Sequence, residues 1–314
     1  MIYSRYIDFI FIKFPFLFLI IYLLILFIFP DYENILSLIV LLFFAEPHFG
    51  ATWTLFRDKE MMNHAKKNKF EYFYLTIFLV FLSTFVFIIN KEIFFFCFFL
   101  YNAWHVNKQS YGICNLYSKM KSENIFQKKL IFIFNLFIIF FGSILYLMLG
   151  IISNDFAYQL GIIFLILSFI FCIIQFIKYK NLENSFLSLT GILIFMPSFF
   201  VSKPIHALLA GVTMHYSQYI AITLKIYLGK NKIEILSSKE FFKKLYKIRG
   251  YLIWIFFYGS MATLLTFFGS ISDSFFSSLL LIPILGQIIH FYIDGLVWKF
   301  KDPKIKEINL KYIY

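Results

Sequence analysis

Charged residues are scarce in this sequence. Only 15% of its 314 residues are Asp, Glu, Lys or Arg, whereas soluble domains carry about 25%. Hydrophobic residues make up 61% and the mean hydropathy is +0.80. Such a chain cannot cover a water-facing surface with polar side chains, so a soluble enzyme, a disordered chain and a coiled coil are excluded. We therefore expect a polytopic membrane protein.

Cysteines and the motifs of soluble enzymes are also missing. Cys97, Cys114 and Cys172 lie in apolar stretches and form no C-x-x-C pair, which argues against a disulfide framework and a thiolate metal site. There is no P-loop, no G-x-G-x-x-G, no G-x-S-x-G and no H-E-x-x-H. The paired histidine boxes of membrane desaturases are absent too. Any chemistry must therefore come from polar side chains scattered within apolar segments.

Ten apolar runs are long enough, at about 20 residues, to cross a bilayer as helices. Transmembrane strands would be about 10 residues long and would alternate in polarity. We therefore expect an all-α polytopic integral membrane protein with about ten transmembrane helices in one domain covering 1–314. The expected spans are 7–29, 34–56, 71–89, 92–117, 130–150, 156–178, 184–201, 204–228, 250–270 and 275–298.

Connections rich and poor in lysine and arginine alternate between these runs. The connections 57–70, 118–129 and 229–249 hold five, four and seven of them, and the turn at 179–183 holds Lys180 with Lys178 beside it at the helix end. The connections between these hold one or none. By the positive-inside rule, both termini are cytoplasmic, which fits a bacterial inner (cytoplasmic) membrane. This distribution also accounts for the net charge of +12 without a nucleic-acid partner.

The longest basic connection, 229–249, has apolar residues among its lysines. Phe241, Phe242 and Leu245 alternate with them in a pattern typical of an amphipathic helix on the cytoplasmic membrane surface. A solvated connector is the alternative, and the sequence favours neither.

Four of the apolar runs contain polar side chains in their interior, where such groups are costly in a bilayer. Each of these runs contributes one histidine of interest: His48, His105, His215 and His290. All four runs are expected to cross from outside to inside. Counting back from their cytoplasmic ends at about 1.5 Å per residue puts the four imidazoles at similar depth, in the inner half of the membrane.

Three of these histidines have a polar neighbour about one helical turn further on. The pairs are His105 with Gln109, His215 with Gln218, and His290 with Asp294. Residues at this spacing share a helix face, so each neighbour can fix the tautomer of its imidazole, as around many metal-bound histidines. Simple hydrogen bonding between helices is the other explanation of a histidine inside a membrane.

Glu46 is the single residue that most needs a functional explanation, because burying an unpaired carboxylate within a membrane costs much free energy. It is open whether Glu46 is a ligand, a general base or the partner of Lys108. We expect Glu46 and Asp294 to have catalytic roles, by orienting ligands or moving protons. We expect Gln109, Gln218 and Lys108 to surround the ligands.

Neutral imidazoles with nearby carboxylates suit iron, zinc or copper, and the absence of thiolate ligands disfavours structural zinc. We expect His48, His105, His215 and His290 to hold one metal ion, Fe²⁺ or another transition metal. Non-haem iron with open coordination positions would allow oxygen chemistry on a lipid-soluble substrate that enters from the bilayer.

The residues around three of the histidines also resemble those of a known family. The segment P-H-F-G at 47–50 resembles the PHG element of the Brp/Blh β-carotene 15,15′-dioxygenase family, and W-H at 104–105 resembles its WHFG element. His215 and Tyr219 resemble its helix with two histidines one turn apart, with Tyr219 at the second position. The resemblance implies a four-histidine iron site in the membrane that cleaves β-carotene to retinal. The iron ligands that it implies are His48, His105 and His215.

Our leading hypothesis is a membrane-embedded, iron-dependent oxygenase acting on a hydrophobic polyene or another lipid, with carotenoid cleavage as one form. Because Tyr219 replaces the second histidine of the pair, the fourth ligand is expected from another helix, as His290. A proton-coupled transporter that uses intramembrane His, Glu and Asp stays open, as does a metal-independent lipid transferase with one histidine as general base. The expected partners are membrane lipids and the lipid-soluble substrate, and the oligomeric state is left open.

Overall fold

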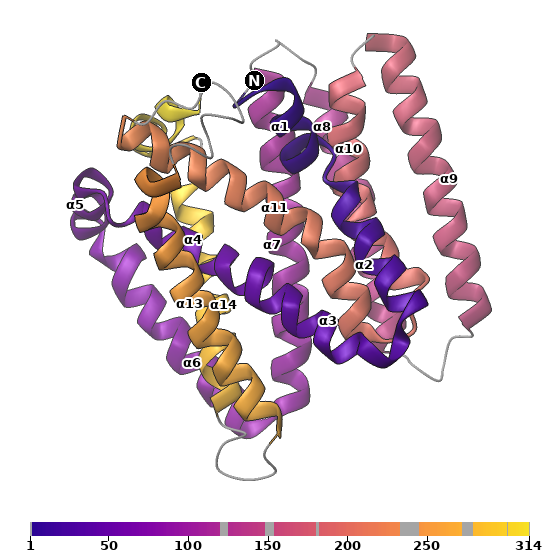
Figure 1. Cartoon of the computed structure of the whole chain (residues 1–314), viewed down its shortest axis with the longest axis horizontal. Coiled ribbons are helices and arrows are strands. Elements are labelled where there is room, and N and C mark those ends of the chain that lie inside the picture. Colours follow the sequence, from indigo (N-terminus) through magenta and orange to yellow (C-terminus); the bar gives the residue numbers. More distant parts are fainter. Residues whose placement is uncertain are drawn as a thin grey trace. The chain divides into compact units, whose positions relative to one another are not determined.

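The computed structural model describes residues 2–119, 125–147, 154–179, 182–232, 245–271, 279–299 and 301–313 (Figure 1). These residues are helical almost throughout and contain no β-strand, which confirms the all-α prediction. The α-helices are α1 (Arg5–Asp8), α2 (Phe16–Ile28), α3 (Glu33–Val40), α4 (Glu46–Leu55), α5 (Lys59–Lys67), α6 (Leu75–Ile89), α7 (Lys91–Lys119), α8 (Ile125–Leu147), α9 (Asn154–Tyr179), α10 (Leu182–Leu193), α11 (Pro204–Lys230), α13 (Leu245–Ile271), α14 (Leu281–Val297) and α15 (Pro303–Ile308). Shorter 3₁₀ and π turns are η1 (Phe9–Lys13), η2 (Pro30–Tyr32), η3 (Leu41–Ala45), η4 (Phe70–Tyr74), η5 (Met196–Phe199) and η7 (Leu310–Tyr312).

The chain forms two compact units. One unit comprises Arg5–Ser37 and Ala103–Gln218, and the other comprises Ile2–Ser4, Leu38–Asn102 and Tyr219–Tyr314. We call them the first and the second unit. Three continuous helical segments, α3 with its π turn, α7 and α11, begin in one unit and end in the other.

In the first unit, the N-terminal segment is broken. The predicted helix 7–29 divides into Arg5–Lys13 and Phe16–Ile28, which meet at a bend of 53°. Pro15 causes the break, because a proline cannot donate the helical hydrogen bond and its ring clashes with the preceding turn. The single continuous helix expected from hydropathy is thus replaced by two shorter ones.

Side chains from elsewhere in the first unit satisfy the carbonyls that the break sets free. Ser217 Oγ donates to the carbonyl of Phe11 at 3.1 Å, and Gln218 Nε2 donates to the carbonyl of Ile12 at 2.6 Å. A third donor, Thr190 Oγ1, lies 2.9 Å from the next carbonyl along the chain, that of residue 13. Non-helical backbone within a membrane is tolerated where the protein supplies such partners. The break is therefore a stable feature of the fold.

In the second unit, α4 packs closely on α13, and α14 packs on α6. Gly259 of α13 permits the first contact. A Cβ added at Gly259 would lie 2.8 Å from the ring of Pro47, and one added at Gly50 would lie 3.0 Å from Tyr258 Cβ. Small residues allow helix backbones to approach in this way. This packing sets the position of α4, which carries His48.

Within the described residues, four helical segments are long and apolar enough to cross a membrane, and the bent N-terminal pair would make a fifth if it is one span. The four are Pro30–Leu55, Phe70–Ile89, Tyr158–Lys178 and Ile248–Gly269. A helix lies within each of the ten predicted segments, but α10 and α14 have only 12 and 17 residues. Helices α7 and α11 contain the polar side chains of the candidate site, which lower their hydropathy. Several helices can thus span a membrane, while the number ten and the cytoplasmic termini stay predictions.

The predicted amphipathic helix in 229–249 falls largely on residues 233–244, which lie outside the described residues. Helix α11 ends at Lys230 and α13 begins at Leu245. The choice between a surface helix and a connector therefore stays open.

Candidate metal centre

All four histidines predicted as ligands are buried, with at most 5% of any side chain exposed. His48 lies on α4, His105 on α7, His215 on α11 and His290 on α14. Each unit contains two of them. Burial of four imidazoles, each with polar nitrogen atoms, demands partners within the protein.

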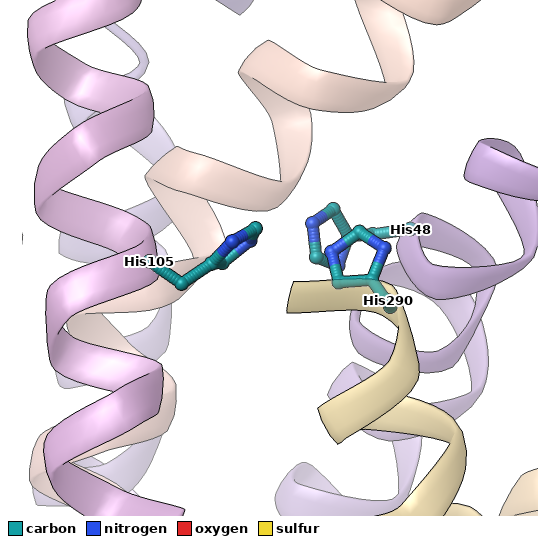
Figure 2. A group of neighbouring side chains, drawn as sticks. All are labelled: His48, His105 and His290. Carbon is teal, nitrogen blue, oxygen red and sulfur yellow. The ribbon is translucent and has the colours of Figure 1, made fainter. Parts of the chain in front are cut away.

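His48 and His290 form the pair of the second unit. Their ring centroids are 4.5 Å apart, and the ring planes meet at 73°. Tyr219 packs against both rings, at 4.7 Å from His48 and 5.5 Å from His290. Figure 2 shows the two imidazoles side by side, reaching out from α4 and α14.

His105 and His215 form the pair of the first unit. Their ring centroids are 5.6 Å apart and the planes are nearly perpendicular, at 87°. Neither ring is stacked face to face on the other. Both pairs thus bring imidazoles from two different helices together.

Three of these side chains, His48, His105 and His290, are a buried group that could hold a metal ion (Figure 2). Each offers an Nδ1 or an Nε2 as ligand atom. The donor set consists of neutral imidazoles without a thiolate, which suits a transition metal and does not single out one of them. The prediction of a group of buried histidines that could hold a metal ion is confirmed for these three residues. The identity of the metal stays a prediction.

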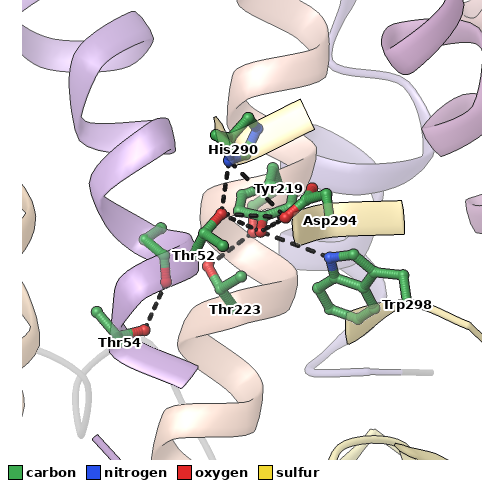
Figure 3. Close-up of polar contacts among 8 residues, drawn as sticks. Thr52, Thr54, Tyr219, Thr223, His290, Asp294 and Trp298 are labelled. Atoms are coloured by element: carbon green, nitrogen blue, oxygen red, sulfur yellow. Dashed lines mark hydrogen bonds and ion pairs between the residues drawn. The ribbon is translucent and has the colours of Figure 1, made fainter. Parts of the chain in front are cut away.

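A hydrogen-bond network surrounds His290 in the second unit (Figure 3). Thr52 Oγ1 is its hub, at 2.6 Å from His290 Nδ1, 2.6 Å from the Tyr219 hydroxyl and 3.1 Å from Asp294 Oδ1. The Tyr219 hydroxyl donates to Asp294 Oδ1 at 2.6 Å, and Trp298 Nε1 lies 3.5 Å from that hydroxyl. Asp294 thus reaches His290 chiefly through a threonine, since its own oxygen lies 3.8 Å from Nδ1.

The carboxylate of Asp294 determines where the protons lie, because a carboxylate accepts hydrogen bonds and donates none. Tyr219 directs its only hydroxyl proton to Asp294, and Thr52 then shares its own between the Tyr219 oxygen at 2.6 Å and Asp294 Oδ1 at 3.1 Å. Thr52 Oγ1 can then only accept at its contact with His290, so we assign the proton of the imidazole to Nδ1. The lone pair of His290 is therefore on Nε2, the atom that remains for a ligand.

Glu46, the first residue of α4, is 1% exposed. Its Oε1 accepts a hydrogen bond of 3.2 Å from Gln287 Nε2 on α14. Its Oε2 has no hydrogen-bond partner among the described residues. The π turn η3 precedes it directly, and such turns often occur at functional positions. The predicted catalytic role of Glu46 is not tested by these contacts.

The amides and the lysine predicted around the ligands differ in their surroundings. The amide group of Gln218 is held at the broken N-terminal helix, by its bond to Ile12. Lys108 is exposed and lies over the rings of Trp104 and Phe132, at 4.7 and 5.0 Å, a cation–π arrangement. Gln109 is partly buried on α7. Asp294, in contrast, reaches His290 through Thr52.

Thr52 is a site residue that the sequence analysis did not identify. It follows His48 by four residues, the same spacing that links Tyr219 to His215. Residues four apart share a helix face, so this spacing was a usable signal. Threonine is common in helices within membranes, however, and that made the signal weak.

Comparisons of the chain with protein-family models, with curated proteins and with solved structures give no match. The argument for a function therefore depends on the side chains themselves.

Proposed function

We propose that this chain is a membrane-embedded oxygenase that uses one transition metal, iron in the first instance, to oxidise a lipid-soluble polyene. His48, His105, His215 and His290 would hold the metal. In this proposal the chain crosses a bacterial inner membrane about ten times, with both termini in the cytoplasm. The observation that carries it is the burial of four imidazoles on four helices of a strongly hydrophobic chain, because buried polar groups in a membrane usually serve a function.

Helix α11 connects the two histidine pairs. Tyr219 of α11 packs on both His48 and His290. His215 precedes Tyr219 by four residues on the same continuous helix, so it lies on the same face about 6 Å away along the axis. This spacing supports a position for His215 one turn from the other pair.

Helix α7 supports the same arrangement for His105. Tyr101 packs edge-on against Phe291, with 5.5 Å between the ring centroids. Phe291 directly follows His290 in α14, and His105 follows Tyr101 by four residues in α7. His105 is thus one turn beyond a contact with the neighbour of His290. In the proposal, the four histidines share one site.

The chain's own residues would bind and orient the metal. Thr52 holds Nδ1 of His290 and so directs Nε2 to the site. The carboxylates of Glu46 and Asp294 reduce the cost of a divalent cation among neutral ligands within a membrane. Iron held by four histidines keeps open coordination positions, and so it would supply activation of dioxygen.

Aromatic side chains near His290 support a polyene as the proposed substrate. Phe49 lies 4.9 Å from its ring, and Phe291 packs on Phe49, Phe98 and Tyr101 at 5.5–6.1 Å. Aromatic side chains favour an extended apolar substrate. Together with the resemblance of 47–50 and 104–105 to carotene dioxygenase motifs, this favours carotenoid cleavage as the first reaction to assay.

The test is the metal content of the full chain, purified in detergent from iron-replete cells without chelators. We expect about one iron per chain, lost when any one of the four histidines is replaced by alanine. His64→Ala is the matched control, because His64 lies on α5 and contacts Asn68 rather than another predicted ligand. Wild-type protein without a transition metal would refute the proposal. If the wild type contains no metal and a single histidine proves essential for a lipid reaction, the metal-independent transferase replaces the oxygenase as the proposed function.

A proton-coupled carrier is the second candidate, and the broken N-terminal helix favours it. Carriers often bind their substrates at discontinuous helices. Lys13, 1% exposed at the end of η1, pairs with Glu183 at 3.0 Å, and Tyr117 donates to the buried Asp8 at 3.1 Å. Uptake into proteoliposomes that is lost in Glu46→Gln would support this function. Uptake unchanged in that variant, or absent in wild type, would exclude the proton-coupled form.

A further inference from the structure

A cavity of about 400 Å³ lies in the second unit, lined by Arg57, Gly250, Ile253, Trp254 and Phe257. Arg57 is in the short link between α4 and α5, and the other four residues are on α13. None of the five belongs to the candidate metal centre, so the cavity needs an explanation of its own.

One end of the cavity is cationic. Arg57 Nη1 donates a hydrogen bond of 3.3 Å to the carbonyl of Gly250. A guanidinium has five N–H groups in a planar fork, so this contact orients the group and leaves donors for a ligand. Such a fork matches the oxygens of a phosphate in a two-pronged arrangement. Arg249 and Lys59, both exposed, add positive charge at neighbouring positions in the sequence.

The rest of the cavity is an apolar face of α13. Gly250, Ile253, Trp254 and Phe257 follow the spacing i, i+3, i+4, i+7 and so form one stripe. The side chains of Ile253, Trp254 and Phe257 are 67, 39 and 62% exposed. The stripe continues at this spacing through the exposed residues Met261, Leu264 and Phe268. From Gly250 to Phe268 it measures about 27 Å, long enough for an acyl chain.

We propose that this groove binds an anionic phospholipid, with the phosphate on Arg57 and an acyl chain along the exposed face of α13. The apolar wall argues for a lipid rather than a free anion, because inorganic phosphate would gain nothing from Ile253, Trp254 and Phe257. Ile248–Gly269 is also one of the segments able to cross a membrane. Arg57 lies in the first basic connection, 57–70, where the positive-inside rule expects anionic cytoplasmic lipids. The proposal is independent of the histidine site.

Trp254 provides a direct test, since brominated acyl chains quench tryptophan fluorescence on contact. The full chain is reconstituted in phosphatidylcholine vesicles that contain a small, equal fraction of dibrominated phosphatidylglycerol or dibrominated phosphatidylcholine. We expect the phosphatidylglycerol to occupy the groove with about fivefold preference, seen as stronger quenching. Trp254→Phe should remove the excess quenching, because Trp53, Trp104 and Trp298 do not line the groove.

Arg57→Gln and Lys59→Gln separate a specific site from general attraction to a basic surface. Each removes one exposed positive charge from the same segment, and only Arg57 lines the cavity. We expect the preference to vanish in Arg57→Gln and to persist in Lys59→Gln. Equal preference in these two variants, or equal quenching by the two lipids in wild type, would overturn the proposal. Displacement by excess inorganic phosphate at constant ionic strength would show a soluble-anion site and overturn it as well.

Discussion

Replacing Thr52 by valine tests the network around His290 most directly. Valine keeps the shape of the side chain and removes the hydroxyl that joins His290, Tyr219 and Asp294. Tyr219 would still donate to Asp294, at 2.6 Å in the wild type. His290 Nδ1–H would lose its acceptor, because the carboxylate oxygen lies 3.8 Å away. The variant therefore removes the three contacts of Thr52 and keeps the hydrogen bond between Tyr219 and Asp294.

The magnitude follows from these contacts. Loss of a partner that orients a metal-bound histidine lowers metal affinity by about 10–100-fold, which is about 1.4–2.7 kcal/mol. A buried donor left without an acceptor costs about 1–3 kcal/mol. The first figure concerns metal binding and the second concerns the stability of the fold. We therefore expect Thr52→Val to bind metal about 10–100-fold more weakly and to lose about 1–3 kcal/mol of its free energy of unfolding.

The assay is competition for Co²⁺ or Fe²⁺ between detergent-purified protein and a chelator of known affinity. Thr54→Val is the matched control, because Thr54 is also buried and lies on the same helix. Among the described residues, its hydroxyl donates to the carbonyl of Ala51 and to no member of the network (Figure 3). Its affinity should stay within about twofold of wild type. A folded Thr52→Val protein with wild-type affinity, or an equal loss in both variants, would refute the assigned role of Thr52.

Three further predictions follow from the packing and from the proposed metal. Gly259→Ala should lower the free energy of unfolding by about 1–3 kcal/mol, because its Cβ would meet Pro47 at 2.8 Å; Gly295→Ala, with no atom within 4 Å of its Cβ, should have little effect in the same denaturation experiment. Gln218→Leu should cost about 1–3 kcal/mol, because the carbonyl of Ile12 loses its donor; unchanged thermal unfolding would contradict the role of Gln218 at the helix break. A chelator should lower the melting temperature of the metal-loaded wild type and leave that of its metal-free form unchanged, as calorimetry would show.

Hydropathy alone located the helices well. The predicted segment 156–178 corresponds to α9, Asn154–Tyr179, and 204–228 corresponds to α11, Pro204–Lys230. Such agreement is expected, since the hydropathy of a segment depends only on its own residues. The same reasoning identified His48, His105 and His290 as polar residues in apolar runs, and the structure buries all three.

The break in the N-terminal helix is a feature that hydropathy did not predict. Pro15 was visible in the sequence, but the run around it was apolar enough to be taken as one span. The break is stable because Ser217, Gln218 and Thr190 supply donors to the freed carbonyls. These donors are 177 to 206 residues away along the chain, so no local sequence pattern predicts them.

By itself the sequence determined an all-helical chain suited to a membrane and the buried histidines that make a metal site plausible. Only the tertiary structure decided that Asp294 acts on His290 through Thr52, and that Gln218 serves the helix break instead of its neighbour His215. The reason is geometric. Spacing within a helix defines which residues share a face, whereas a bond between helices also depends on the rotation and axial shift of each helix, and packing contacts such as Gly259 against Pro47 set these.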